Sequence, residues 1–65
     1  MVMVNGQATP QAVGQTIAHF LASNGFDLSR VAVEYNGEIV SKDSYAQQYL
    51  ANGDVLEVVT FVGGG

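Results

Sequence analysis

The sequence predicts an α+β fold in which one main helix lies across one face of a mixed β-sheet. Asn-Gly pairs at positions 5–6, 36–37 and 52–53 separate segments that are rich in β-branched and aromatic residues. Residues 16–24 show helical periodicity instead, and residues 54–62 form the longest stretch of strong β-formers. A chain of 65 residues has room for a single hydrophobic core, so we expect one domain.

The N-terminal segment predicts a β-hairpin at the edge of the sheet. Residues 1–4 are apolar and are followed by Asn5-Gly6, a pair that readily adopts the positive φ angles of a two-residue hairpin turn. We expect residues 7–13 to form the returning strand. Pro10 has no backbone N–H to donate, which favours an edge position for this strand.

The predicted helix covers residues 16–24. Thr16 can cap its N-terminus, and Gly25 can supply the left-handed residue that follows its C-terminus, with Phe26 packing back onto the last turn. A spacing of 100° per residue places four side chains on one side of the helix: Ile17, Phe20, Leu21 and Asn24. His19 and Ser23 fall on the opposite, polar side.

Residues 31–35 predict a strand that presents Val31, Val33 and Tyr35 on one face. The Asn-Gly pair at 36–37 turns this strand into a second hairpin with residues 38–40.

A short helical turn is expected next, capped by Ser41 or Asp43 and carrying three apolar side chains: Tyr45, Tyr49 and Leu50. The last strand spans residues 54–62. This order of elements predicts a β-grasp, or ubiquitin-like, fold whose first and last strands are adjacent and parallel. By alternation, Leu56 and Val58 should be buried against the helix.

Composition excludes several classes of function. The chain has two basic and six acidic residues and a formal net charge of −4, which argues against nucleic-acid binding. It has no cysteine and one histidine, so a thiol nucleophile and a zinc site are both excluded. His19 has no carboxylate at helical spacing to orient it, so we expect no catalytic residues and no bound metal or cofactor. No segment reads as a signal peptide or a membrane span, which favours the cytoplasm and no membrane partner.

The remaining candidate for a functional site is the glycine tail, Gly63-Gly64-Gly65, which follows a domain of residues 1–62. A frayed terminus or a cloning remnant would have the same composition. Glycine has no side chain, however, so a flexible glycine segment can pass through a slot that excludes other residues. Residues 61–65 can extend roughly 14 Å, enough to place a carboxylate in the active site of another protein.

The segment 52–65 resembles the end of the ThiS sulfur carriers of thiamine biosynthesis, with a Gly-Asp turn, a Val-rich strand and a terminal Gly-Gly. Residues 14–16, 33–40 and 43–46 resemble the same family. Ser41-Lys42 departs from it, since Pro-Arg is common there, and a Trp is common near Tyr45. The departures concern contacts with partners.

The resemblance implies a non-enzymatic carrier. A ThiF-like enzyme would use ATP to adenylate the carboxylate of Gly65, while Gly63 and Gly64 thread its active site. A sulfur donor such as a cysteine desulfurase would then supply the atom that gives a thiocarboxylate, and a ThiG-like thiazole synthase would use it.

Alternation along the last strand also predicts a docking surface for these partners. It consists of the residues that face away from the helix: Val55, Glu57, Val59 and Phe61. Three other functions remain open: a MoaD-like small subunit of molybdopterin synthase, a ubiquitin-like protein modifier, and a β-grasp binding module whose tail is incidental.

Overall fold

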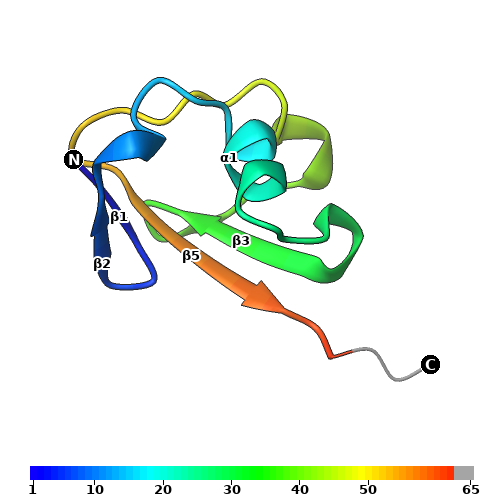
Figure 1. The fold of residues 1–65 in the computed structure, drawn as a ribbon. Helices are drawn as coiled ribbons and strands as arrows, with labels where there is room; N and C mark the ends of the chain where they lie inside the picture. Colours follow the sequence, from blue (N-terminus) through cyan, green and yellow to red (C-terminus); the bar gives the residue numbers. More distant parts are fainter. Residues whose placement is uncertain (63–65) are drawn as a thin grey trace.

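The computed structural model describes residues 1–62 and shows one helix on one face of a five-stranded mixed sheet (Figure 1). The helix, α1, spans Ile17–Ser23. The strands are β1 (Val2–Val4), β2 (Gln7–Thr9), β3 (Val31–Tyr35), β4 (Glu38–Ile39) and β5 (Val55–Thr60). Their order in the sheet is β2-β1-β5-β3-β4. The predicted α+β architecture is confirmed.

The last strand lies at the centre of the sheet. β5 runs parallel to β1, with Met3 beside Val55, and antiparallel to β3, with Val33 beside Val58. The predicted parallel pairing of the first and last strands is therefore correct. β5 is paired on both edges and, with Val55–Thr60, is the longest strand of the described sheet.

Both hairpins turn at the predicted Asn-Gly pairs. In the first turn φ is +49° at Asn5 and +80° at Gly6, and in the second it is +52° at Asn36 and +87° at Gly37. Two consecutive positive φ angles match the twist of antiparallel strands, which is why asparagine and glycine are favoured there.

The returning strand of the first hairpin is shorter than predicted. β2 ends at Thr9, and Pro10–Ala12 forms a 3₁₀ helix instead of continuing the strand. Proline suits the first position of a helix, where its missing N–H is not needed, and the turn places the side chain of Ala12 in the core. The predicted edge position of β2 is correct.

The ends of α1 are formed by the predicted capping residues. The Thr16 side chain accepts a hydrogen bond of 3.1 Å from the His19 backbone N–H. At the other end the N–H groups of Gly25 and Phe26 donate to Ala22 and Leu21, at 3.2 and 3.0 Å. These two bonds form a Schellman motif, for which Gly25 adopts a φ of +82°.

The segment before β5 differs from the prediction. Lys42–Ser44 forms a single 3₁₀ turn, Asp43 lies inside it, and Ser41 precedes it without a side-chain hydrogen bond to the backbone. Tyr45 and Leu50 are buried. Tyr49 is 63% exposed, because residues 45–50 do not continue as a helix and Tyr49 instead forms an isolated bridge with Thr16.

The core lies between α1 and the sheet. Leu56 and Val58 of β5 belong to the same cluster of buried residues as the helix residues Ile17, Phe20 and Leu21, which confirms the predicted register. The Asn5 side chain extends the pairing of β1 with β5: it donates to the Val58 carbonyl at 3.2 Å and accepts from the Val58 N–H at 2.7 Å. One amide thereby occupies the edge of β5 where β1 turns away.

Candidate functional site

The residues of β5 that face away from the helix are exposed, as predicted. Val55 is 41% exposed, Val59 is 58% exposed and Phe61, just after the strand, is 56% exposed. Glu57, which lies between Val55 and Val59 in the alternation, is exposed as well. No irregular segment within residues 1–62 covers these positions. That they form a docking surface stays a prediction.

The exposed apolar surface extends beyond β5 to its neighbours. The strand registers place Met3 beside Val55, Ala32 beside Val59, and Ile39 beside Glu34, which itself lies beside Glu57. Ile39 is 82% exposed. We call this surface the open sheet face and define it by its residues: Met3, Ala32, Glu34, Ile39, Val55, Glu57, Val59 and Phe61. Alternation within β3 and β4 could have identified Glu34 and Ile39, but only the strand register places them beside β5.

Asp54 holds the start of β5 in place. Its carboxylate accepts hydrogen bonds from the Tyr35 hydroxyl and the Ala51 N–H, both at 2.8 Å, and from the Asn36 amide at 3.1 Å. The Asn36 side-chain oxygen accepts a hydrogen bond from the Val55 N–H at 2.8 Å. This network joins β5 to the β3–β4 turn.

Partial burial favours the neutral form of Asp54, but the hydrogen bonds from Ala51, Asn36 and Tyr35 outweigh it, and the pKa of Asp54 lies below its usual value. A carboxylate whose pKa falls on folding adds stability above its unfolded pKa of about 3.9, and this stability is lost as the pH falls through the folded value.

We therefore expect acidification below about pH 4 to destabilise the protein in part through Asp54. Asp54→Asn should unfold more easily at pH 7 and lose less further stability on acidification than the wild type does. Urea denaturation of both proteins between neutral and acidic pH measures the difference. Parallel pH profiles for the two proteins would contradict this role.

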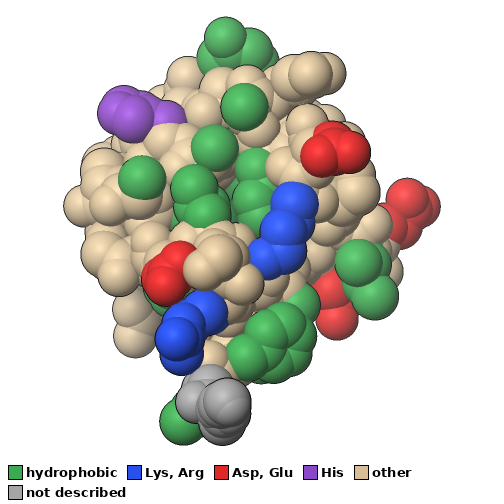
Figure 2. All heavy atoms as spheres, turned by 90° about the vertical axis from the view of Figure 1, so that its right-hand side faces the viewer, with side chains coloured by type: hydrophobic (Ala, Val, Ile, Leu, Met, Phe, Trp, Pro, Cys, Tyr) green, Lys and Arg blue, Asp and Glu red, His purple; other side chains and the backbone are tan. Residues whose placement is uncertain are grey.

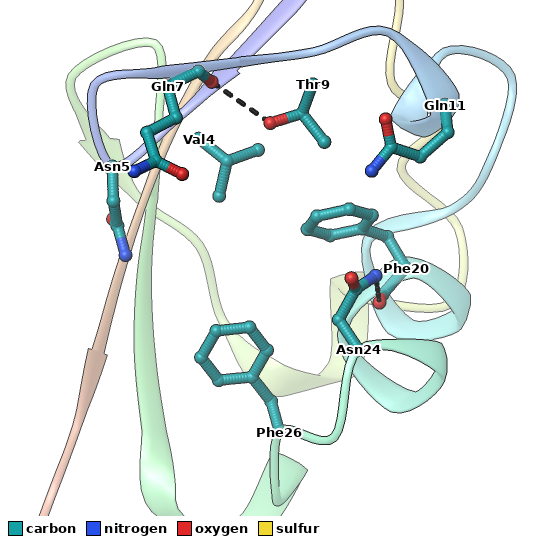
Figure 3. A pocket seen from close by; sticks show the side chains of 8 residues that line it. All are labelled: Val4, Asn5, Gln7, Thr9, Gln11, Phe20, Asn24 and Phe26. Atoms are coloured by element: carbon teal, nitrogen blue, oxygen red, sulfur yellow. Dashed lines mark hydrogen bonds between the residues drawn. The ribbon is translucent and has the colours of Figure 1, made fainter.

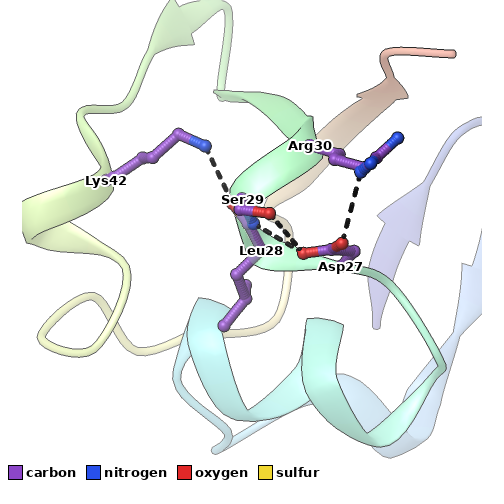
Figure 4. Close-up of polar contacts among 5 residues, drawn as sticks. All are labelled: Asp27, Leu28, Ser29, Arg30 and Lys42. Carbon is purple, nitrogen blue, oxygen red and sulfur yellow. Dashed lines mark hydrogen bonds and ion pairs between the residues drawn. The ribbon is translucent and has the colours of Figure 1, made fainter. Parts of the chain in front are cut away.

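The end of β5 is fixed by the loop that precedes β3. The Phe61 N–H donates to the Arg30 carbonyl at 2.7 Å, so the β3–β5 ladder continues one residue past the strand. Arg30 pairs with Asp27 at 3.5 Å, and Lys42 Nζ donates to the Leu28 carbonyl at 2.9 Å (Figure 4). Both basic side chains of the protein are visible at this end of the molecule (Figure 2).

Asp27 is the acidic partner within this cluster. Hydrogen bonds from the Ser29 hydroxyl and backbone, at 2.7 and 3.0 Å, and the nearby charges of Arg30 and Lys42 lower the pKa of Asp27. Asp27 is thus an acceptor that orders the turn before β3.

The predicted reactive tail, Gly63, Gly64 and Gly65, lies outside the described residues. The described residues show where the chain leaves the domain before this tail. Phe61 is hydrogen-bonded to the domain, and Val62 is 98% exposed. The chain therefore leaves the domain at the edge of the open sheet face.

A hollow of about 280 Å³ lies on the other side of the sheet, between the first hairpin and α1 (Figure 3). Apolar side chains meet uncharged polar ones around it: Val4, Asn5, Gln7, Thr9, Gln11, Phe20, Asn24 and Phe26. The amides of Asn5 and Asn24 are already bonded to the backbone, at Val58 and Phe20. None of the described residues that line the hollow is charged, and its one hydroxyl, that of Thr9, donates to the Gln7 carbonyl at 3.0 Å.

Within residues 1–62, no group of three His, Cys, Asp or Glu side chains could hold a metal ion. His19 is exposed on α1. No helix in this part of the chain is long and apolar enough to cross a membrane.

Comparison with known proteins identifies the family. The model of the ThiS family matches residues 2–65. This chain belongs to the ThiS family. The match covers the described domain from Val2 onward and the three glycines that follow it.

Relatives and solved structures agree with the ThiS assignment. The chain is 46% identical over 50 residues to the sulfur carrier protein ThiS of Bacillus subtilis, covering 77% of this chain and 76% of that protein. The crystal structure of the thiamine biosynthesis protein ThiS from Geobacter metallireducens superimposes with a TM-score of 0.77 at 27% identity, covering 98% of this chain and 97% of that one. The predicted β-grasp fold is thereby confirmed.

A longer protein is also similar to this ThiS chain. Over 64 residues the chain is 44% identical to a thiazole synthase of Paramagnetospirillum magneticum. The match covers 98% of this chain and 20% of that relative, so the chain spans about a fifth of its length.

Proposed function

We propose that this protein is a sulfur carrier of thiamine biosynthesis and that the carboxylate of Gly65 carries the sulfur as a thiocarboxylate. The observation that carries the proposal is the ThiS family match, which runs through residues 2–65 and so includes the glycines after β5. The Bacillus subtilis relative named as a sulfur carrier supports it. The protein is then a substrate of its partners and not an enzyme.

The chemistry of a carboxylate explains why activation is needed. Ionised at neutral pH, it is a poor electrophile. An oxygen of the Gly65 carboxylate would attack the α-phosphorus of ATP, and pyrophosphate would leave. Hydrosulfide would then attack the carbonyl carbon of the acyl-adenylate, and AMP would leave with the bridging oxygen. With a persulfide as the nucleophile, a thiol reductant would afterwards cleave the S–S bond of the acyl disulfide to leave the thiocarboxylate. Because the chain has no cysteine, no side-chain thiol can carry the sulfur instead.

Three partners follow from this chemistry. A ThiF-like adenylating enzyme would bind the ATP, a donor such as a cysteine desulfurase would supply the sulfur, and a ThiG-like thiazole synthase would consume it. The similarity to part of a thiazole synthase supports the last of these. We propose the cytoplasm as the site of this chemistry.

The proposal is tested by incubating the full chain with ATP, a ThiF-like enzyme and a sulfur donor. We expect pyrophosphate release, followed by the mass increase that corresponds to one oxygen replaced by sulfur. A protein modifier would instead gain the mass of a whole protein, and an inert binding module would give no product. The intact mass of the starting protein checks that Gly65 ends in a free carboxylate.

Docking of the adenylating enzyme on the open sheet face leads to a separate prediction. Val59→Asp places a charge where an apolar contact is proposed, and Val59 is 58% exposed in the free domain. We expect the affinity for the enzyme to fall by about tenfold or more, because an unpaired charge would be buried. The fold should persist. Calorimetric titration measures the affinity, and an unchanged value removes Val59 from the interface.

A further inference from the structure

Two glutamates occupy opposite positions on neighbouring strands at the centre of the open sheet face. The antiparallel register of β3 and β5 places Glu34 directly opposite Glu57. Side chains at opposite positions have Cβ atoms about 5 Å apart, and like charges there destabilise a sheet. Opposite charges at the same positions would stabilise it, so this pair works against the fold.

The domain does not compensate this repulsion. Its two basic residues are Arg30 and Lys42. Arg30 pairs with Asp27, in the only salt bridge among residues 1–62, and Lys42 donates to the Leu28 carbonyl. Glu34 and Glu57 therefore have no cation of the described domain beside them.

The two carboxylates are surrounded by apolar side chains that water reaches. Ile39 lies beside Glu34, and Val55 and Val59 precede and follow Glu57 on the same face. The exposed fractions of Ile39 and Val59 are 82% and 58%. A partner that covered these side chains would also remove water from both carboxylates, which is costly unless a cation is supplied at the same time.

An arginine has the chemistry that this arrangement requires. Its planar guanidinium presents several N–H donors and can bond two carboxylates at once, while its aliphatic stem packs on apolar neighbours. The open sheet face also ends at Phe61, next to the start of the glycine tail, so a partner that receives the tail is in position to cover it.

We propose that the open sheet face docks a partner that inserts an arginine between Glu34 and Glu57 and surrounds it with apolar side chains. The inference rests on the proposed function, because the partner is taken to be the adenylating enzyme that activates the tail. It adds Glu34 and Ile39 to the surface and assigns a charge to its occupant.

Three isosteric variants of the full chain test the proposal. Glu34→Gln and Glu57→Gln each relieve the repulsion but remove an acceptor, so affinity for the adenylating enzyme should fall about tenfold. The midpoint of urea denaturation should stay the same or rise. Glu38→Gln is the matched control. It removes the same charge, but Glu38 lies beside Tyr35, on the opposite side of the sheet from the open sheet face. Its affinity should equal that of the wild type.

The outcomes separate this inference from the proposed function. If the wild type is adenylated and all three variants bind alike, the arginine site is wrong and the carrier function stands. If the wild type is neither bound nor adenylated, the carrier function fails and the inference fails with it. If ultracentrifugation shows a wild-type dimer that Glu34→Gln dissociates, a second copy covers the face and the proposed occupant is wrong.

Discussion

Gly64→Val should abolish adenylation of the protein while leaving its fold intact. A β-branched side chain restricts φ and ψ and widens the segment that must pass into the partner's active site. Every buried residue of the described domain lies between Val2 and Val58 in the sequence. The free energy of unfolding should therefore change by no more than about 0.5 kcal/mol, as for an ordinary surface substitution.

Pyrophosphate release with ATP and the adenylating enzyme measures the effect, and urea denaturation checks the fold. A chain extended by one residue after Gly65 provides a second test, because it moves the carboxylate away from the reacting position without adding a branched side chain at Gly64. Activation of either variant at the wild-type rate would show that the tail is incidental and would refute the carrier function.

Leu56→Ala should have the largest effect on stability. Leu56 is fully buried in the central strand β5 and belongs to the same core cluster as Ile17 and Leu21 of α1. Truncating a buried leucine costs roughly 2–5 kcal/mol through lost burial and the cavity that remains. A domain of this size rarely has more than about 3–5 kcal/mol to lose, so we expect a largely unfolded protein at room temperature.

The matched control is Val59→Ala in the same strand. Val59 points to the other side of the sheet and is mostly exposed, so its truncation should cost less than about 0.5 kcal/mol. Circular dichroism during thermal unfolding compares the two variants. Equal melting temperatures would mean that the packing of β5 against α1 contributes little.

Sequence reasoning succeeded where the determinants are local. The turn at Asn5-Gly6, the Thr16 cap and the Gly25 C-terminus each depend on the conformations available to one or two residues, and all three are confirmed. Alternation along β5 gave the correct buried and exposed faces for the same reason. The prediction for residues 7–13 was wrong from Pro10 onward. Proline is compatible with either an edge strand or the start of a helix, and the 3₁₀ helix is the conformation that buries Ala12 in the core.

What the sequence could not provide is the relation between distant segments. The opposition of Glu34 and Glu57 depends on the register of β3 against β5, and neither residue specifies that register alone. The bonds from Asn5 to Val58 join positions 53 apart in the chain. Tyr49 was expected on a short helical turn with Leu50, but the helical turn ends at Ser44, and Tyr49 forms an isolated bridge with Thr16.

The pairing of β5 has a mechanical consequence for any partner that draws on the chain through Val62. Such a pull acts along the strand, while the hydrogen bonds to β1 and β3 lie across it. The force then acts in shear on all the interstrand hydrogen bonds of β5 together, and it does not break them one after another. Asn5 adds two further rungs at Val58, close to the point where the force enters. We therefore expect the domain to stay folded when a partner binds and pulls on its C-terminal end.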